Sequence, residues 1–228
     1  MFGPQPENEL FSILHRAACG EYPPGDFTTT HVPSPQSPAD AVLAFFGHHL
    51  LASSVDGKFV RAWTDADPFA LSDVRFLSAL ASKLSTTPGI YDAVFAARGI
   101  GATPKQFGLV ELNDCDHPRA QRALAYRDPE TLRVFADVTG AGVLVMGRGL
   151  AGRLEAAYEV APEARGKGIG RELIRAARMI APRGEPVFLQ ISPGNVWSMQ
   201  ALASDVTSWR CVGSEVLFLR HPKGKRVD

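Results

Sequence analysis

EVAPEARGKGIG, residues 159–170, stands between a run of strand-like residues and a run with helical periodicity. Its three glycines, Gly166, Gly168 and Gly170, let the backbone come close to a ligand. The first amide groups of a helix have no partners inside it, so this loop leaves N–H donors at the positive end of the helix dipole. The stretch therefore predicts a site for an anion, and a phosphate group is its natural ligand.

The spacing of the glycines excludes two common phosphate-binding loops. A P-loop needs G-x-x-x-x-G-K-[ST], but Ala161 stands five residues before Gly166, and Lys167 is followed by Gly168 instead of a hydroxyl residue. A dinucleotide-binding fingerprint needs G-x-G-x-x-G, whereas Arg171 stands where its third glycine is required. Neither class of nucleotide-binding loop fits.

The residues around the loop predict an ordered series of elements. Glycine-containing turns join three strand-like runs before it, as in an antiparallel meander, and Pro182-Arg183-Gly184 ends the helix after it. The expected series is strands at 132–138, 143–150 and 153–160, the loop, a helix at 168–181, a strand at 187–191, a helix at 195–204 and a pair of strands within 209–219.

This loop resembles the acetyl-coenzyme A loop of the GNAT superfamily of N-acetyltransferases, whose pattern is [RQ]-x-x-G-x-[GA] after a strand that ends in Val-x-Pro. Arg165, Gly168 and Gly170 match the first part, and Val160 and Pro162 match the second. The resemblance covers about residues 130–220, and the first hundred residues do not match closely. It implies an α/β fold on a mixed, mostly antiparallel sheet, with a GNAT-like acetyl-CoA-binding region in the C-terminal half and an extra N-terminal α/β portion. The alternative is a glycine-rich turn before an ordinary helix.

The resemblance also implies a binding site for the cosubstrate acetyl-CoA, without a metal. Val160 would pair its backbone with the pantetheine arm, where strands 153–160 and 187–191 splay apart. Asn195 would contact the same arm, or would only cap its own helix. The side chains of Lys167 and Arg171 would touch phosphates, or would stay solvated. The pyrophosphate would be held by backbone N–H groups of Arg165, Gly166, Lys167, Gly168, Ile169 and Gly170.

Acetyl transfer to an amine needs a group that takes a proton from the amine and a group that gives one to the leaving thiolate. The candidate bases are Glu155 and Glu159, which strand alternation places on one face, while Tyr158 points to the other. A bulge, frequent in this strand of the family, would reverse part of that parity. Glu215 on the last strand is a further candidate base.

The usual acid of the family is in doubt. Many relatives carry a tyrosine about seven residues into the helix led by Asn195, where this chain has Leu202. Tyr158, Ser198, Cys211 or water would have to take its place.

The first half of the chain predicts a mixture of helices and strands. Five prolines between Tyr22 and Asp40 predict a linker or surface loop. The segment at 104–116 is ambiguous. The expected elements are a helix at 7–18, a strand at 41–51, helices at 56–63 and 72–84, the second with Ser72 as its cap, a strand at 90–96 and a helix at 117–126.

Composition excludes several classes of protein. The 228 residues include 24 Lys+Arg and 24 Asp+Glu, so the long-range attraction that nucleic-acid and membrane binders use is missing. Cys19, Cys115 and Cys211 are odd in number and widely spaced, which suits a reducing cytoplasm and predicts neither a disulfide framework nor a metal site. His48-His49 lacks metal-ligand spacing. No apolar run reaches the roughly 20 residues that span a bilayer, and the N-terminus shows no signal peptide.

These features together predict a cytoplasmic N-acetyltransferase that moves acetyl from acetyl-CoA to a small-molecule or peptide amine in a ternary complex. The rivals are a non-catalytic acyl-CoA sensor or interaction module, and an enzyme that uses a longer acyl donor. A homodimer is left open. The expected organisation is an N-terminal helix with a proline-rich segment at 1–40, an α/β portion at 41–128 and the GNAT-like region at 129–228.

Overall fold

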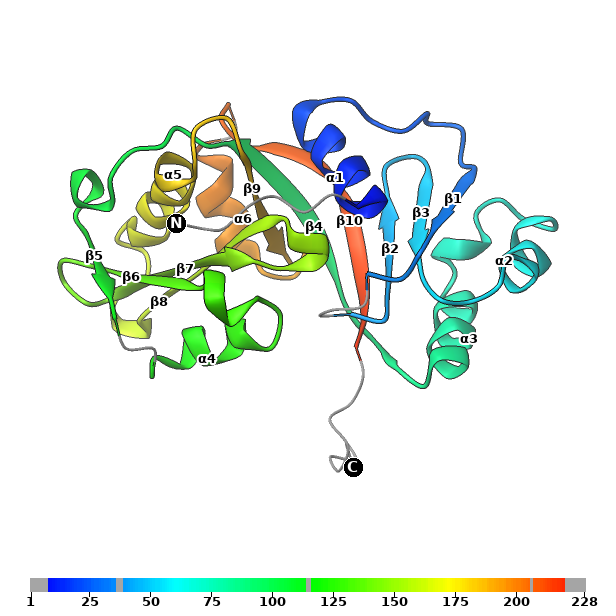
Figure 1. The fold of residues 1–228 in the computed structure, drawn as a ribbon. Helices are drawn as coiled ribbons and strands as arrows, with labels where there is room; N and C mark the ends of the chain where they lie inside the picture. Colours follow the sequence, from blue (N-terminus) through cyan, green and yellow to red (C-terminus); the bar gives the residue numbers. More distant parts are fainter. Residues whose placement is uncertain (1–7, 36–38, 114–115, 206, 220–228) are drawn as a thin grey trace.

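A mixed sheet runs through the computed structural model, which describes residues 8–35, 39–113, 116–205 and 207–219. In these residues ten strands form one sheet in the order β1-β3-β2-β10-β4-β9-β8-β7-β6-β5 (Figure 1). The strands are β1 Thr29–Val32, β2 Ala41–Phe45, β3 His49–Ala52, β4 Thr87–Arg98, β5 Leu109–Leu112, β6 Arg133–Asp137, β7 Gly142–Arg148, β8 Leu154–Val160, β9 Pro186–Ile191 and β10 Arg210–Leu219. The α-helices are α1 Glu9–Cys19, α2 Gly57–Thr64, α3 Val74–Leu84, α4 Pro118–Leu124, α5 Ile169–Ile180 and α6 Val196–Ala203.

The elements around the loop follow the predicted order, with one exception. The meander β6-β7-β8 is antiparallel, α5 follows the loop, and Asn195 caps α6 by accepting a hydrogen bond from the Ser198 amide. The predicted pair of terminal strands is wrong, because 210–219 form the single strand β10. Its register against β4 shifts between Cys211 and Gly213, and Gly213 has φ 152°. A glycine at a bulge looks like a turn when only the sequence is read.

The first half also matches in its helices. α1, α2, α3 and α4 lie where helices were predicted, but Asp73 caps α3 in place of Ser72, by accepting a hydrogen bond from the Arg75 amide. The apolar run at 41–51 is a hairpin of two strands, β2 and β3, that turns at Gly47 with φ 77°. The proline-rich segment is not wholly a loop, because it contains β1. The ambiguous segment holds a 3-10 turn at Pro104–Phe107 and then β5.

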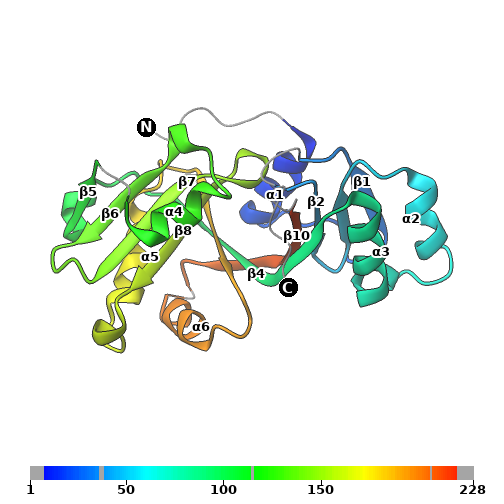
Figure 2. The same ribbon diagram turned by 90° about the horizontal axis from the view of Figure 1, so that it is seen from below.

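Strand β4 joins the two halves of the chain. It comes from the N-terminal portion, yet it lies between β9 and β10 and pairs antiparallel with both (Figures 1 and 2). Alternate β4 residues face two layers: Val94 packs with α1, and Phe95 packs against the cluster that holds α5 and α6. The sheet thus continues across residue 128, where the sequence predicts a boundary; the predicted division into domains stays a prediction.

Helices cover both faces of the sheet. Apolar residues of α5 and α6 share one core cluster with β7, β8 and β9. Ala120 and Ala123 of α4 pack on the opposite face, against Val134, Val143 and Val145 of β6 and β7. Figure 2 shows α2 and α3 at the far end of the sheet from α5.

The opening that positions the candidate site lies between β8 and β9. These parallel strands pair only through Leu154–Ala156 and Val187–Leu189. Beyond these residues the two strands diverge, as the sequence predicts, and the backbone of β8 from 157 to 160 is paired on the β7 side. Two cavities are lined by residues of β8 beyond this point.

Three further findings bear on the class of protein. Within the described ranges, no helix has the length and apolar character needed to cross a bilayer. The same residues contain no group of three or more side chains that would hold a metal ion. Cys19 and Cys211 are free thiols, while Cys115 lies outside the described residues.

Candidate active site

The glycine loop forms an open cradle of backbone amides at the start of α5. Gly166 and Gly168 have φ 76° and 86°, the left-handed region that favours glycine. Gly168 is the N-cap of α5 without a side-chain cap, and the Glu172 N–H donates a hydrogen bond to the Gly168 carbonyl. A Cβ added at Gly166 or Gly168 would meet no atom within 4 Å among the described residues. The amides of the first turn of α5 therefore face open space and suit an anion.

A cleft of about 830 Å³ lies over this cradle, between the loop and α6. Trp197 on α6 is 79% exposed at its edge. Lys167 lines a neighbouring cavity on the far side of the loop instead, and Arg171 reaches both. The structure brings the other predicted cofactor residues together around the cleft: Val160, Arg165, Gly166, Gly168, Ile169, Gly170, Arg171 and Asn195.

Two of these residues already make contacts of their own. The Arg165 Nε donates a hydrogen bond of 3.2 Å to the Val160 carbonyl. A carbonyl has two lone pairs, so Val160 can accept a second bond from a ligand. Asn195 caps α6, which fits the plainer of its two interpretations, and it also lines the cleft.

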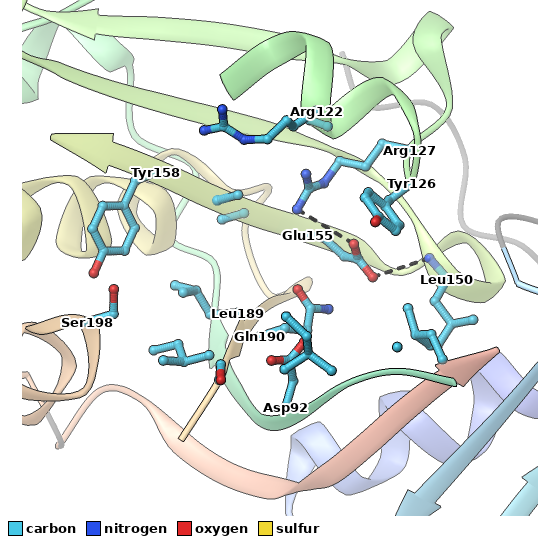
Figure 3. A pocket seen from close by; sticks show the side chains of 18 of the residues that line it. Asp92, Arg122, Tyr126, Arg127, Leu150, Glu155, Tyr158, Leu189, Gln190 and Ser198 are labelled. Carbon is cyan, nitrogen blue, oxygen red and sulfur yellow. Dashed lines mark hydrogen bonds and ion pairs between the residues drawn. The ribbon is translucent and has the colours of Figure 1, made fainter. Parts of the chain in front are cut away.

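A second cavity of about 460 Å³ lies at the opening between β8 and β9 (Figure 3). Its walls come from α4, β4, β8, β9 and β10. Both cavities are lined by Tyr158, Glu159, Asn195 and Ser198. The amide cradle and the second cavity therefore meet at these four residues.

Side chains of β8 alternate between the two faces as predicted. Tyr158 and Val160 pack against the cluster that contains α5 and α6. Glu155 and Glu159 face the α4 side, where they pair with Arg127 and Arg122. The register of β8 on β7 runs from Leu154 to Val160 without a shift, so the parity of the strand is unbroken.

A buried ion network lies beneath the second cavity. Arg153, with 0% exposure, donates from Nε to Glu155 at 2.8 Å and from its two terminal nitrogens to Glu215 at 2.8 and 2.6 Å. Its guanidinium carbon lies 5.0 Å from the centre of the Phe188 ring. Burial alone would lower the pKa of Arg153, but Glu215 and Glu155 outweigh burial and raise it. Both carboxylates therefore belong to the packed framework under the cavity.

Glu155 and Glu159 are both engaged by cations. Glu155 also accepts a hydrogen bond of 3.2 Å from the Leu150 amide and lies 3.7 Å from Arg127 (Figure 3). Glu159 forms an ion pair with Arg122 of α4. Both carboxylates are already paired with arginines, so each is a weaker candidate for the general base.

Asp92 is a carboxylate that sequence reasoning missed. It lies on β4 directly opposite Glu215 of β10 and lines the second cavity. It makes no hydrogen bond or ion pair with any residue the structure describes. Burial, and then the charge of Glu215, raise the pKa of Asp92 to about 6, while Arg153 lowers it. The available signal was a lone charge in the apolar run IYDAVFA, residues 90–96.

Tyr158 presents a phenol where the two cavities meet. Its hydroxyl is buried without a hydrogen-bond partner among the described residues. Figure 3 shows it facing the Ser198 hydroxyl. Burial raises the pKa of Tyr158, and Ser198 partly opposes that rise. The phenol is therefore protonated at neutral pH and has a proton to give.

Neither Leu202 nor Cys211 is placed to act as the acid. Leu202, where the resemblance implies an acid, is 4% exposed and packs in the core with α5. Cys211 is exposed near the start of β10 and is not among the residues that line either cavity.

Comparison with known proteins identifies a family. The model of the acetyltransferase (GNAT) family matches residues 105–203, which include the amide cradle, Tyr158 and α6. No curated protein matches the chain. The sequence-based recognition of this family is confirmed for that region.

Three solved structures of GNAT-family or GCN5-related acetyltransferases are distantly similar to this chain. A GNAT-family structure from Novosphingobium aromaticivorans is 20% identical over 59% of this chain and 66% of that one, with a TM-score of 0.42. A GNAT-family acetyltransferase from Colwellia psychrerythraea is 13% identical over 63% of this chain and 62% of its own, with a TM-score of 0.36. A GCN5-related N-acetyltransferase from Kribbella flavida is 12% identical over 83% and 91%, with a TM-score of 0.39. The chain spans slightly less than two thirds of the first two structures.

Proposed function

We propose that this chain, whose residues 105–203 match the GNAT acetyltransferase family, transfers an acetyl group from acetyl-CoA to an amine. The observation that carries the proposal is the meeting of two cavities at Tyr158 and Ser198. One cavity has an amide cradle for a diphosphate, and the other has carboxylates for an amine. A direct transfer needs both reactants side by side, and this arrangement holds them so.

The residues of the cleft fit the coenzyme. Unpaired amides at the start of α5 suit the pyrophosphate, and the open space above Gly166 and Gly168 leaves room for it. Val160, at the divergent end of β8, can bond the pantetheine arm through its backbone. When bound, acetyl-CoA supplies the activated thioester.

Asp92 is the preferred group for taking the proton of the amine. An alkyl amine with a pKa of about 10.4 is almost wholly protonated at pH 7. Forming the neutral amine costs about 4 to 5 kcal/mol, which a base must offset. The sequence-based candidates Glu155 and Glu159 are held by arginines, whereas Asp92 has no such partner. A carboxyl with a pKa of about 6 is ionised at neutral pH and is a better proton acceptor than an ordinary one.

Tyr158 is the preferred group for giving a proton to the leaving thiolate. It packs on the side of α5 and α6, where the coenzyme cleft lies, while Asp92 lies beside Glu215 next to the ion network. Both proton-transfer groups thus line the second cavity. The amine would pass between them to the thioester.

The proposal is tested by titrating purified protein with acetyl-CoA in a calorimeter and by measuring thiol release with a panel of amines. We expect saturable binding, and release of one thiol for each amide formed. Absence of acetyl-CoA binding by folded protein would overturn the assignment.

A second function is favoured by Leu202, which occupies the expected position of the acid. An acyl-CoA sensor would bind the coenzyme as tightly but would release no thiol with any amine in the panel. A longer acyl donor is distinguished by comparing the affinities of acetyl-, succinyl- and malonyl-CoA in the same calorimetric titration.

A further inference from the structure

The second cavity is surrounded by charges that nearly all pair with one another. Arg153 satisfies Glu155 and Glu215. Arg122 pairs with Glu159. After these pairs are formed, two cavity-lining groups of opposite charge have no partner within ion-pair distance among the described residues: Arg119 on α4 and Asp92 on β4.

Arg119 is a guanidinium held in a place that disfavours its charge. Its Nε is buried without a hydrogen-bond partner among the described residues. Burial, and then the nearby charges of Arg127 and Arg122, lower the pKa of Arg119 to about 10, against a smaller opposing effect of Glu159. An anion in the cavity would relieve this repulsion and supply the missing acceptor.

Arg127 adds a second donor on the same wall. It is 8% exposed, and its Nε is also buried without a partner, although a terminal nitrogen lies 3.7 Å from Glu155. Figure 3 shows Arg127 and Arg122 on one side of the cavity and Asp92 on the other. The cavity therefore has a basic wall at α4 and an acidic wall at β4.

Apolar side chains form part of the remaining lining, together with polar ones from β9 and α6. Between the two charged walls the cavity is lined by Ile90, Tyr126, Leu150, Leu189 and Leu217. A ligand that matches this lining has an anionic end, an apolar body and an amine. A cationic ligand such as a polyamine would supply no acceptor for the buried Nε of Arg119 and would bring more positive charge towards it, which costs free energy.

We propose that the acceptor is a small amine that carries a carboxylate, as an amino acid does. Its carboxylate binds to Arg119 and Arg127, and its amine lies towards Asp92 and the opening between β8 and β9. One unpaired guanidinium matches one negative charge, which favours a carboxylate over a doubly charged phosphate ester. A guanidinium also presents its donors in the fork that a planar carboxylate accepts. This inference rests on the proposed acetyl transfer.

The test compares each acid with its own amide, since the pair keeps the shape of the molecule and removes the negative charge, and rates are compared for equal concentrations of neutral amine. Thiol release is measured for the twenty amino acids, β-alanine and γ-aminobutyrate, and for their carboxamides, with phosphoethanolamine and spermidine alongside. We expect the best carboxylate to exceed its amide at least tenfold in kcat/KM. A preference for the amide, for spermidine or for phosphoethanolamine over every carboxylate would overturn the inference.

Variants locate the effect on the basic wall. Arg119→Gln is expected to lower kcat/KM at least tenfold for the best carboxylate and less than threefold for its amide. Arg119→Lys, which keeps the charge but loses the fork, should fall between Arg119→Gln and the unsubstituted protein. Arg175→Gln on the outer side of α5, whose partner is Glu172, is the matched control and should change neither value. Equal losses of Arg119→Gln on acid and amide would contradict carboxylate binding there.

A binding measurement separates this inference from the proposed function. Calorimetry on protein saturated with CoA reports binding of the acid and of the amide without any turnover, and we expect at least tenfold tighter binding of the acid, lost in Arg119→Gln. Failure to bind acetyl-CoA would remove the proposed function. Acetyl-CoA binding with no preference for the acid in this titration would remove only the carboxylate acceptor.

Discussion

Tyr158 and Asp92 divide the two proton transfers of the proposed reaction between them. Strand alternation places Tyr158 on the face of α5 and α6, away from Glu155 and Glu159. Asp92 lies beside Glu215, with its charge disfavoured by burial. Each residue has a property that a purely structural side chain does not need: a buried hydroxyl without a partner, and a carboxyl with a raised pKa.

Tyr158→Phe is expected to lower kcat by about 100-fold, because the leaving thiolate loses its proton donor. The melting temperature should change little, since the substitution removes a buried hydroxyl whose described neighbour, Ser198, leaves it without a full hydrogen bond. Steady-state kinetics and thermal unfolding on one preparation measure both effects. An equal loss of activity and stability would indicate a structural role instead.

Asp92→Asn separates charge from shape at the acidic wall. We expect kcat/KM of the unsubstituted protein to rise with pH through about 6 as Asp92 ionises, and this acidic limb to disappear in the variant along with about 100-fold of activity. Burial sets this titration first, then the charge of Glu215, which also raises the pKa of Asp92, and the charge of Arg153, which lowers it.

Asp92→Asn should raise the stability of the protein at neutral pH, although it lowers the activity. The folded-state pKa of Asp92 is raised from 3.8 to about 6, so the folded protein binds this proton more tightly than the unfolded chain does. Stability of the unsubstituted protein is therefore lost between about pH 4 and 6 as the pH rises, and the loss is complete above 6. Asp92→Asn should melt higher at pH 7.5 and about equally at pH 4. A lower melting temperature at pH 7.5 would show that Asp92 has a stabilising partner.

At the scale of single elements, the start of α5 depends on backbone that a side chain would obstruct. Gly168→Ala is expected to raise the Kd for acetyl-CoA about tenfold or more, because the new methyl group enters the open space where the diphosphate would lie. The substitution should also cost about 1 to 2 kcal/mol of stability, because an alanine at φ 86° is strained.

Gly184→Ala is the matched control for this loop. Gly184 has φ 82° and open space around it, but it follows the C-terminal end of α5. It should lose similar stability without any change in acetyl-CoA affinity, as followed by calorimetry or by the fluorescence of Trp197 at the cleft. If both variants lost affinity equally, strain in α5 and not obstruction of the cradle would explain the effect.

The elements near the loop could be predicted because their signals are local. Glycine spacing, helical periodicity and strand alternation all act within about fifteen residues, and they located the cradle, α5 and the faces of β8. The hairpin β2-β3 was missed because its turn at Gly47 interrupts an otherwise continuous apolar run, and the bulge in β10 because it depends on pairing with β4, which is distant in sequence. Asp92 and Arg119 were missed for the same reason, since only the fold brings α4 and β4 to one cavity.

At the scale of the whole molecule, two contacts tie the N-terminal portion to the GNAT-like region. β4 pairs on one side with β9 and on the other with β10, and β10 in turn pairs with β2. Asp92 of β4 also lies opposite Glu215 of β10, whose carboxylate accepts hydrogen bonds from Arg153 beside β8. The floor of the second cavity is thus built from both predicted portions of the chain.

Because β4 pairs with both β9 and β10, we expect the segments 41–128 and 129–228 to unfold together. Trp63 on α2 packs against Phe76 and reports on the first portion, while Trp209 is 3% exposed in the core of the second. We compare a variant whose only tryptophan is Trp63 with a variant whose only tryptophan is Trp209. Urea unfolding followed by fluorescence should give the same midpoint in the two variants, because β4 cannot leave the sheet without exposing both cores. Saturating acetyl-CoA should shift both midpoints equally, since a ligand stabilises the whole cooperative unit that binds it. Separate midpoints, or a shift confined to Trp209, would mean that the boundary near residue 128 divides two independent folding units and that the acceptor wall contributed by β4 is not held rigidly against the cradle.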